Sequence, residues 1–229
     1  MKVTTASILA IMVIYFVSMQ KMFFASTPMP RDSAAADLSL RVVERKTELP
    51  TTIATAARSW TRKLGRRYVW IDVAIDDVPT GRIVAELYMD KVPKTAENFR
   101  GLVTGDNQHE YGYKNSKCHR ILKGFIVQCG AYGGPSIYGK DFEDEKAGLE
   151  LKHSKRYILQ MANAGPNTNG AQFCFMLGAA PHLNGHHVVF GEVVEGFAVV
   201  DQMEEAGVDT DDDTLTHSVI LLDGGEIFD

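Results

Sequence analysis

The stretch "FCFMLGAAPHLNGHHVVFGEV", residues 173–193, combines two short apolar segments with three histidines and an Asn-Gly turn between them. The apolar segments are short and rich in aromatic and β-branched residues, which predicts two strands joined by a loop. The histidines at 182, 186 and 187 have a spacing that could serve a metal site, a catalytic histidine or a binding groove. Asn184-Gly185 interrupts the helix that would place His182 and His186 on one face, which argues against a metal site.

Further short strands are predicted through most of residues 67–229. The candidate segments are "YVWIDVAID", "GRIVAELYM", "CHRILKGFIVQCG", "YILQMANA" and "SVILLDGGEIF". Two helices are predicted, "VPKTAENFRGLVTG" with Pro93 at its first turn and Gly105 at its end, and "FAVVDQMEEAG" closed by Gly207. Many short strands and only two helices predict a mainly β fold, a closed antiparallel barrel. Because small barrels fill their interior with side chains, we expect any site on the outer wall or the rim.

Composition narrows the function classes. The 229 residues allow one large domain or two small ones, and 45% apolar residues are enough for a core. The net charge of -5 argues against general nucleic-acid binding, so no nucleic acid is expected as a partner. Three cysteines are too few for a disulfide scaffold. Cys118 and Cys129 lie on the arms of a predicted hairpin, but their parity differs, so they can pair only if a bulge intervenes.

The N-terminus has a charge-free run of 18 residues, "VTTASILAIMVIYFVSMQ", at 3–20. This length is at the lower limit for a membrane span and exceeds most signal-peptide cores. We therefore expect residues 1–24 to be an uncleaved signal anchor of a single-pass membrane protein of the secretory pathway, in the ER or Golgi, with the domain on the luminal side. The alternative is a cleaved signal peptide and a secreted protein, although "FFAST" matches a cleavage site poorly.

Residues 25–66 indicate a stalk between the anchor and a domain at 67–229. The segment is polar and Pro/Ala-rich at its start and mixes basic and apolar residues later. A solvated linker is the simpler interpretation. The alternative is a basic face that meets anionic lipid, formed by Arg62, Lys63, Arg66 and Arg67.

Five blocks within residues 68–229 carry a family resemblance. They are "DKVPKTAENFR", "HRILKGFIVQ", "SIYGKDFEDE", "MANAGPNTNGAQF" and "HHVVFGEV", in that order. Together they resemble the cyclophilin family of peptidyl-prolyl cis-trans isomerases. The resemblance implies an eight-stranded antiparallel barrel capped by two helices, a groove on one outer face, no metal and no cofactor. It also implies proline-containing polypeptide clients and a role in protein folding. The alternative function is a proline-peptide binding, chaperone or scaffold module with little turnover.

The resemblance assigns the site residues. Arg120 is the expected catalytic residue, because its guanidinium presents several N–H donors to a twisted prolyl amide. Gln128 and Phe125 complete the catalytic set, as a partner of the peptide or of Arg120 and as a wall of the proline pocket. The expected substrate-binding residues are Ile126, Ala162, Asn163, Ala164, Gln172, Cys174, His182, Leu183 and His187.

Two of these positions depart from the family pattern. Cys174 stands where members usually have Phe on the pocket floor, and His182 stands where many have Trp. The resemblance therefore leaves affinity for substrate, and for a cyclosporin-type ligand, open. If the Cys174 floor is deeper, Cys174→Phe improves kcat/KM; if neighbours such as Met176 or His182 fill the gap, Phe overpacks it.

Overall fold

The computed structural model describes residues 59–228 apart from 131–133, 210–214 and 216. All described residues belong to one compact unit, residues 55–229. The predicted anchor at 1–24, and the stalk as far as residue 58, lie outside the described residues. Within the described part, no helix is long and apolar enough to cross a membrane.

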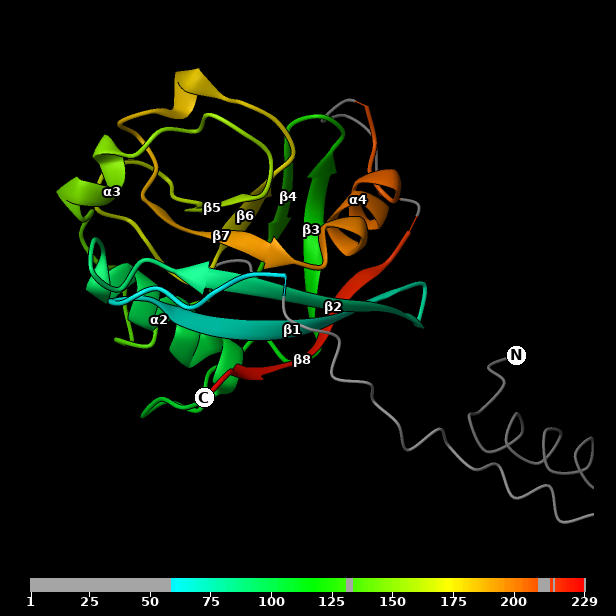
Figure 1. Ribbon diagram of the computed structural model, residues 1–229, viewed down its shortest axis with the longest axis horizontal. Helices are drawn as coiled ribbons and strands as arrows, with labels where there is room; N and C mark the ends of the chain where they lie inside the picture. Colours follow the sequence, from blue (N-terminus) through cyan, green and yellow to red (C-terminus); the bar gives the residue numbers. More distant parts are fainter. Residues whose placement is uncertain (1–58, 131–133, 210–214, 216, 229) are drawn as a thin grey trace, which may run out of the picture. The chain divides into compact units, whose positions relative to one another are not determined.

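Eight strands close into one barrel in the described part of the chain, which confirms the predicted fold (Figure 1). Their order around the barrel is β1-β2-β7-β5-β6-β4-β3-β8, and every neighbouring pair is antiparallel. The strands are β1 (Arg67–Ile75), β2 (Val78–Leu87), β3 (Ser116–Leu122), β4 (Ile126–Cys129), β5 (Ile158–Met161), β6 (Phe173–Met176), β7 (Val189–Glu195) and β8 (Val219–Glu226).

Alternation along the strands divides the buried side chains into two groups. One group combines the inward side chains of the strands with those of the covering helices: Phe99, at 93–104, meets Phe173 at a ring-centroid distance of 4.8 Å and Phe190 at 4.9 Å. The second, smaller group lies on the outer wall of β4, β5, β6 and β7 and includes Ile126 and Cys174. Because the barrel interior is packed, the outer wall is the place left for a site.

The two predicted helices are α2 (Pro93–Thr104) and α4 (Phe197–Glu205), which cover the barrel from different sides (Figure 1). Pro93 opens α2, and Gly105 ends it in the left-handed conformation at φ 72°. Two further elements, α3 (Lys146–Glu150) and the 3₁₀ helix η1 (Pro181–Leu183), were not predicted. Each is too short to show a helical period in the sequence.

Glu145 caps the N-terminus of α2 from a loop about fifty residues further along the chain. Its carboxylate accepts hydrogen bonds from the backbone N–H of Lys94 and of Thr95 at 3.1 and 2.7 Å, and from the Thr95 hydroxyl at 2.7 Å. The local N-cap residue, Val92, has no side-chain acceptor. A negative group at this end of a helix satisfies its unpaired N–H groups and complements its dipole.

Glu145→Ala should lower the free energy of unfolding by about 0.5–2 kcal/mol, the range for loss of a helix cap. Urea denaturation followed by far-UV circular dichroism measures it. The matched control is Glu143→Ala, since Glu143 only pairs with Lys94 at the exposed surface, at 2.7 Å. An equal effect of the two variants would contradict the capping role.

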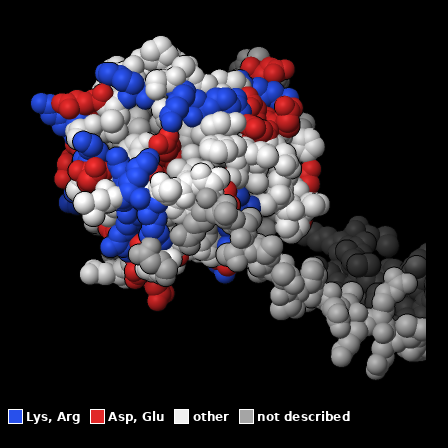
Figure 2. Space-filling model, viewed as in Figure 1, with Lys and Arg blue, Asp and Glu red and all other residues white. Residues whose placement is uncertain are grey.

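Residues 60–66, which we call the N-terminal strap, lie against the barrel just before β1. Trp60 stacks on Tyr68 at a centroid distance of 4.3 Å and donates to Glu195 at 2.9 Å. Lys63 and Arg66 both form ion pairs with the buried Glu86, at 2.9 and 3.4 Å. Figure 2 shows basic side chains gathered next to acidic ones on this view of the molecule. These basic groups of the strap thus have protein partners on the barrel.

Candidate functional site

The hairpin of β3 and β4 places Arg120 directly opposite Gln128. Ile121 and Val127 of the same strands point into the barrel core, whereas Ile126 belongs to the outer group. Arg120, Ile126 and Gln128 therefore face outward together, as their shared parity predicts. Arg120 is only half-buried, so its guanidinium can meet a ligand on this wall.

Cys118 and Cys129 form a disulfide, and a β-bulge at His119 brings them opposite each other. Cys118 pairs with Cys129 in the ladder and Arg120 pairs with Gln128, so His119 is one extra residue on β3. The bulge turns Cys118 into the barrel beside Cys129, and both sulfurs are buried. This resolves the parity conflict in the sequence, because a bulge shifts the alternation by one residue. The disulfide thus ties the two strands that carry Arg120 and Gln128.

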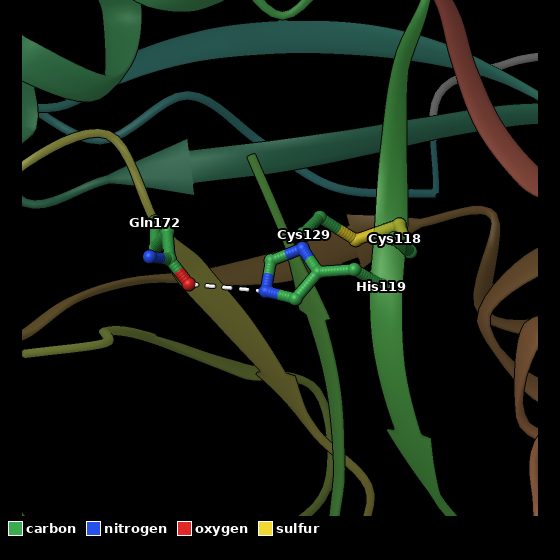
Figure 3. The surroundings of a disulfide bond; sticks show 4 residues. All are labelled: Cys118, His119, Cys129 and Gln172. Atoms are coloured by element: carbon green, nitrogen blue, oxygen red, sulfur yellow. Dashed lines mark hydrogen bonds between the residues drawn. A yellow bond between two sulfur atoms is a disulfide. The ribbon is translucent and has the colours of Figure 1, made fainter. Parts of the chain in front are cut away.

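His119 is a site residue that the sequence analysis missed. Figure 3 shows its ring pointing away from the disulfide toward Gln172, and Nε2 lies 3.0 Å from Gln172 Oε1. Gln128 Nε2 donates to the same oxygen at 2.8 Å. Because that oxygen can only accept, His119 Nε2 carries a proton. The signal for His119 was the unequal parity of the two cysteines, which can pair only if a bulge intervenes.

The apolar part of the site is the smaller hydrophobic group on the outer wall. Its buried members are Ile126, Ile158, Cys174, Met176, Ala180 and Val189, and the half-buried side chains packed against them include Phe125, Ala162 and Leu183. Phe125 lies 5.6 Å from the ring of His182, between centroids. An apolar wall of this kind suits a proline ring.

A pocket of about 600 Å³ lies beside this apolar wall and brings five of the predicted residues together: Gln128, Ala162, Asn163, Ala164 and Gln172. Ala162–Ala164 follow directly after β5. Asn163 donates to the backbone carbonyl of His186 at 2.9 Å, which ties this segment to the histidine loop.

His187 contacts the backbone just before the segment Ala162–Ala164. Its Nδ1 lies 3.0 Å from the backbone carbonyl of Met161. A carbonyl only accepts, so Nδ1 carries the proton and Nε2 of the neutral ring is an acceptor. Burial lowers the pKa of His187, and the Met161 contact opposes this effect. At neutral pH this ring can therefore accept a hydrogen bond from a ligand N–H through Nε2.

Stability should fall as the pH drops below about 6.5, the ordinary histidine value. Burial lowers the folded-state pKa of both His153 and His187, so the unfolded chain binds protons first. Between that value and the lower folded pKa, each ring costs up to about 1.4 kcal/mol of stability per pH unit. Urea denaturation at pH 7.5 and 5.5 measures the loss. His187→Asn should reduce it, and an unchanged pH dependence in that variant would contradict the assignment.

Cys174 is a free, buried cysteine. It is 2% exposed, and burial raises the pKa of its thiol to about 12. Ile126 and Met176 belong to the same buried group on the wall, and Cys174 is covered by packed side chains.

Cys174→Phe should therefore overpack the wall, the second of the two outcomes considered from the sequence. We expect a loss of about 1–3 kcal/mol of stability and a lower kcat/KM on a short Xaa-Pro peptide. Thermal unfolding and steady-state kinetics test this, with Cys174→Ala as the control that adds no volume. A gain in kcat/KM for the Phe variant would show that the floor has free room.

The structure places the twelve predicted site residues on β3, β4 and β6 or in the segments next to β4, β5, β6 and β7, and their individual roles stay predictions. In the part of the chain that the structure describes, no group of three or more His, Cys, Asp or Glu side chains is arranged to hold a metal ion. His182 lies on η1 near Phe125, and His187 hydrogen-bonds β5.

A closed eight-stranded antiparallel barrel with an Arg-Gln pair beside an apolar wall defines the structural class of this protein. Residues 70–223 match the family described as "Cyclophilin type peptidyl-prolyl cis-trans isomerase/CLD". The chain belongs to this family, as its sequence blocks predicted.

Two curated relatives are similar to this chain. "Peptidyl-prolyl cis-trans isomerase 9" of Caenorhabditis elegans and the protein of that name from Caenorhabditis briggsae are each 44% identical over 171 residues. The match covers 69% of this chain and 54% of each relative. The chain therefore spans about half the length of these relatives.

Proposed function

We propose that this protein is a peptidyl-prolyl cis-trans isomerase that acts on proline-containing polypeptides and assists their folding. The observation that carries the proposal is the position of Arg120, opposite Gln128 and next to the apolar wall of Ile126, Phe125 and Cys174. Membership of the family and the names of the two relatives support it.

The arrangement suits a reaction in which no covalent bond breaks. Rotation about an Xaa-Pro bond must pass a barrier of about 18–20 kcal/mol that amide resonance creates. Any group that binds the twisted amide better than the planar one lowers that barrier. A proline ring seated on the apolar wall would bring its amide beside Arg120, and the guanidinium would donate to the twisted, less conjugated amide. Gln172 holds Gln128 at 2.8 Å, which keeps the polar side of the site in place.

A protease-coupled isomerisation assay on an Xaa-Pro peptide with the purified chain tests the proposal. Acceleration over the uncatalysed rate, which is lost in Arg120→Ala, supports an isomerase. Binding of the peptide without acceleration would replace it with the alternative, a proline-peptide binding or scaffold module. A cyclosporin-type ligand should inhibit the chain only weakly, because His182 offers a smaller ring than the Trp of many relatives.

We also propose that residues 1–24 anchor the protein in a membrane of the secretory pathway, with the barrel in the lumen. The charge-free run at 3–20 motivates the anchor. The disulfide between Cys118 and Cys129 supports the luminal side, since disulfides persist in oxidising compartments.

Protease treatment of sealed microsomes tests this topology. The barrel should survive without detergent, and the protein should stay with the membrane in a carbonate wash. Digestion of the barrel in intact microsomes would refute the luminal side. Release by carbonate would refute the anchor and favour a cleaved, secreted form.

A further inference from the structure

Gln160 is a buried polar residue in the apolar outer wall. It pairs with Cys174 across β5 and β6, and Cys174 in turn pairs with Gln128 across β6 and β4. Directly paired residues face the same side of a sheet, so Gln128, Cys174 and Gln160 form one row on the outer wall. Gln160 is only 3% exposed, and its Oε1 has no hydrogen-bond partner among the described residues.

His153 lies beyond Gln160 and is equally buried, at 1% exposure. Its backbone N–H donates to Asn184 Oδ1 at 2.9 Å, and its Nδ1 lies 3.0 Å from the same oxygen. Since that oxygen can only accept, Nδ1 carries the ring proton and Nε2 is left as an acceptor. In the described structure Nε2 also has no partner. Asn184 directly follows η1, which carries His182 and Leu183.

Turning the Gln160 amide by 180° about its last bond gives the unpaired atoms partners. The Gln160 side chain interacts with both His153 and Cys174. With its carbonyl toward His153, two acceptors face each other. With the amide turned, Gln160 Nε2 donates a hydrogen bond to His153 Nε2, and Oε1 can accept a hydrogen bond from the thiol of Cys174. The buried thiol keeps its proton at neutral pH. Every buried polar group in this series of hydrogen bonds then has a partner, and a fully paired buried network holds its side chains in one arrangement.

We propose that Gln160 is a positioning residue for the proline pocket, whose amide links the floor at Cys174 through His153 and Asn184 to the rim at His182 and Leu183. This inference rests on the proposed isomerase function, since it assigns the pocket to the proline ring. The link fixes the floor and the rim relative to each other, so its loss should weaken binding of the ring in the planar and twisted forms alike. The effect should therefore appear in KM and much less in kcat.

The test variant is Gln160→Met, which keeps the side-chain length and removes both hydrogen bonds. In the coupled assay on an Xaa-Pro peptide, KM should rise by about 3- to 10-fold while kcat changes by less than about 2-fold. The matched control is Thr95→Val, which removes an equally buried polar group on α2, far from the wall. It should lower stability and leave KM unchanged. An unchanged KM in folded Gln160→Met would overturn the proposal.

Two further readouts separate positioning from a general loss of structure. In a Cys174→Ala background, Gln160→Met should add less than about 2-fold in KM, because the contact is already broken. In ¹⁵N NMR spectra, the Nε2 signal of His153 should shift toward that of an unbonded acceptor in Gln160→Met and not in Thr95→Val. Additive effects on KM, or an unmoved His153 signal, would overturn the link.

Failure of the isomerase function would be seen separately. Absence of turnover in the parent chain would refute the isomerase function. The role of Gln160 would then be tested by the Kd of the same peptide, measured by NMR titration. A Kd that is equal in the parent and in Gln160→Met would refute the positioning role on its own.

Discussion

Arg120→Ala should lower kcat/KM on an Xaa-Pro peptide by about 100-fold or more, the usual cost of removing a donor that acts on the transition state. Arg120 lies opposite Gln128 on the outer wall and is half-buried, so it is no part of the barrel core. The variant should therefore keep its fold and its thermal midpoint within a few degrees. The coupled isomerisation assay and circular dichroism measure both properties.

The control for Arg120→Ala is Lys123→Ala, which removes one positive charge from the same hairpin. Lys123 is exposed and pairs only loosely with Glu205, at 3.6 Å. Its loss should leave kcat/KM within about 2-fold, since exposed pairs contribute little. A folded Arg120→Ala protein with parental turnover would exclude Arg120 from the mechanism. A loss that Lys123→Ala shares would indicate an effect of net charge.

The sequence predicts the barrel because its signals are local. Alternation in "CHRILKGFIVQCG" marks β3 and β4, and the shared parity of Arg120 and Gln128 puts them on one face, as the ladder shows. Pro93 and Gly105 mark the ends of α2 for reasons of backbone geometry alone. The resemblance carried by the family blocks then implies that the strands close into an eight-stranded antiparallel barrel, which local patterns cannot supply.

The sequence could not predict features that depend on contacts between distant segments. Glu145 reaches α2 from a loop, and Trp60 reaches Glu195 across 135 residues. No local pattern distinguishes such a carboxylate or indole from an ordinary surface side chain. The role of Gln160 is similar, because an isolated Gln in "YILQMANA" would be expected at the surface. Its burial is seen only in the folded structure, where it is 3% exposed and pairs with Cys174.

The bulge at His119 could be predicted from the sequence only in part. Because Cys118 and Cys129 differ in parity, they can form a disulfide only if one strand contains an extra residue. The sequence did not say that this residue is present, because a bulge depends on how both strands meet their other neighbours, β8 and β6. Once it forms, the same extra residue directs Cys118 inward and leaves His119 to meet Gln172.

Loss of this disulfide should lower the free energy of unfolding by about 3 kcal/mol, because the bond closes a loop of about a dozen residues in the unfolded chain. The two cysteines are 11 positions apart and both lie in the barrel core. The cleanest comparison uses Cys174→Ala, which leaves Cys118 and Cys129 as the remaining cysteines of the three in the chain. That variant should show no free thiol when oxidised and two after reduction.

Urea denaturation of Cys174→Ala with and without reductant then measures the contribution of the bond directly. The double variant Cys118→Ala with Cys129→Ala, in the same background, should match the reduced protein within about 1–2 kcal/mol, since it also loses two buried sulfurs. Reductant should not change its unfolding midpoint further. Because the bond ties the strands of Arg120 and Gln128, kcat/KM should fall on reduction, by a smaller factor than in Arg120→Ala. Free thiols in the oxidised protein, or equal midpoints with and without reductant, would show that the bond does not hold this hairpin.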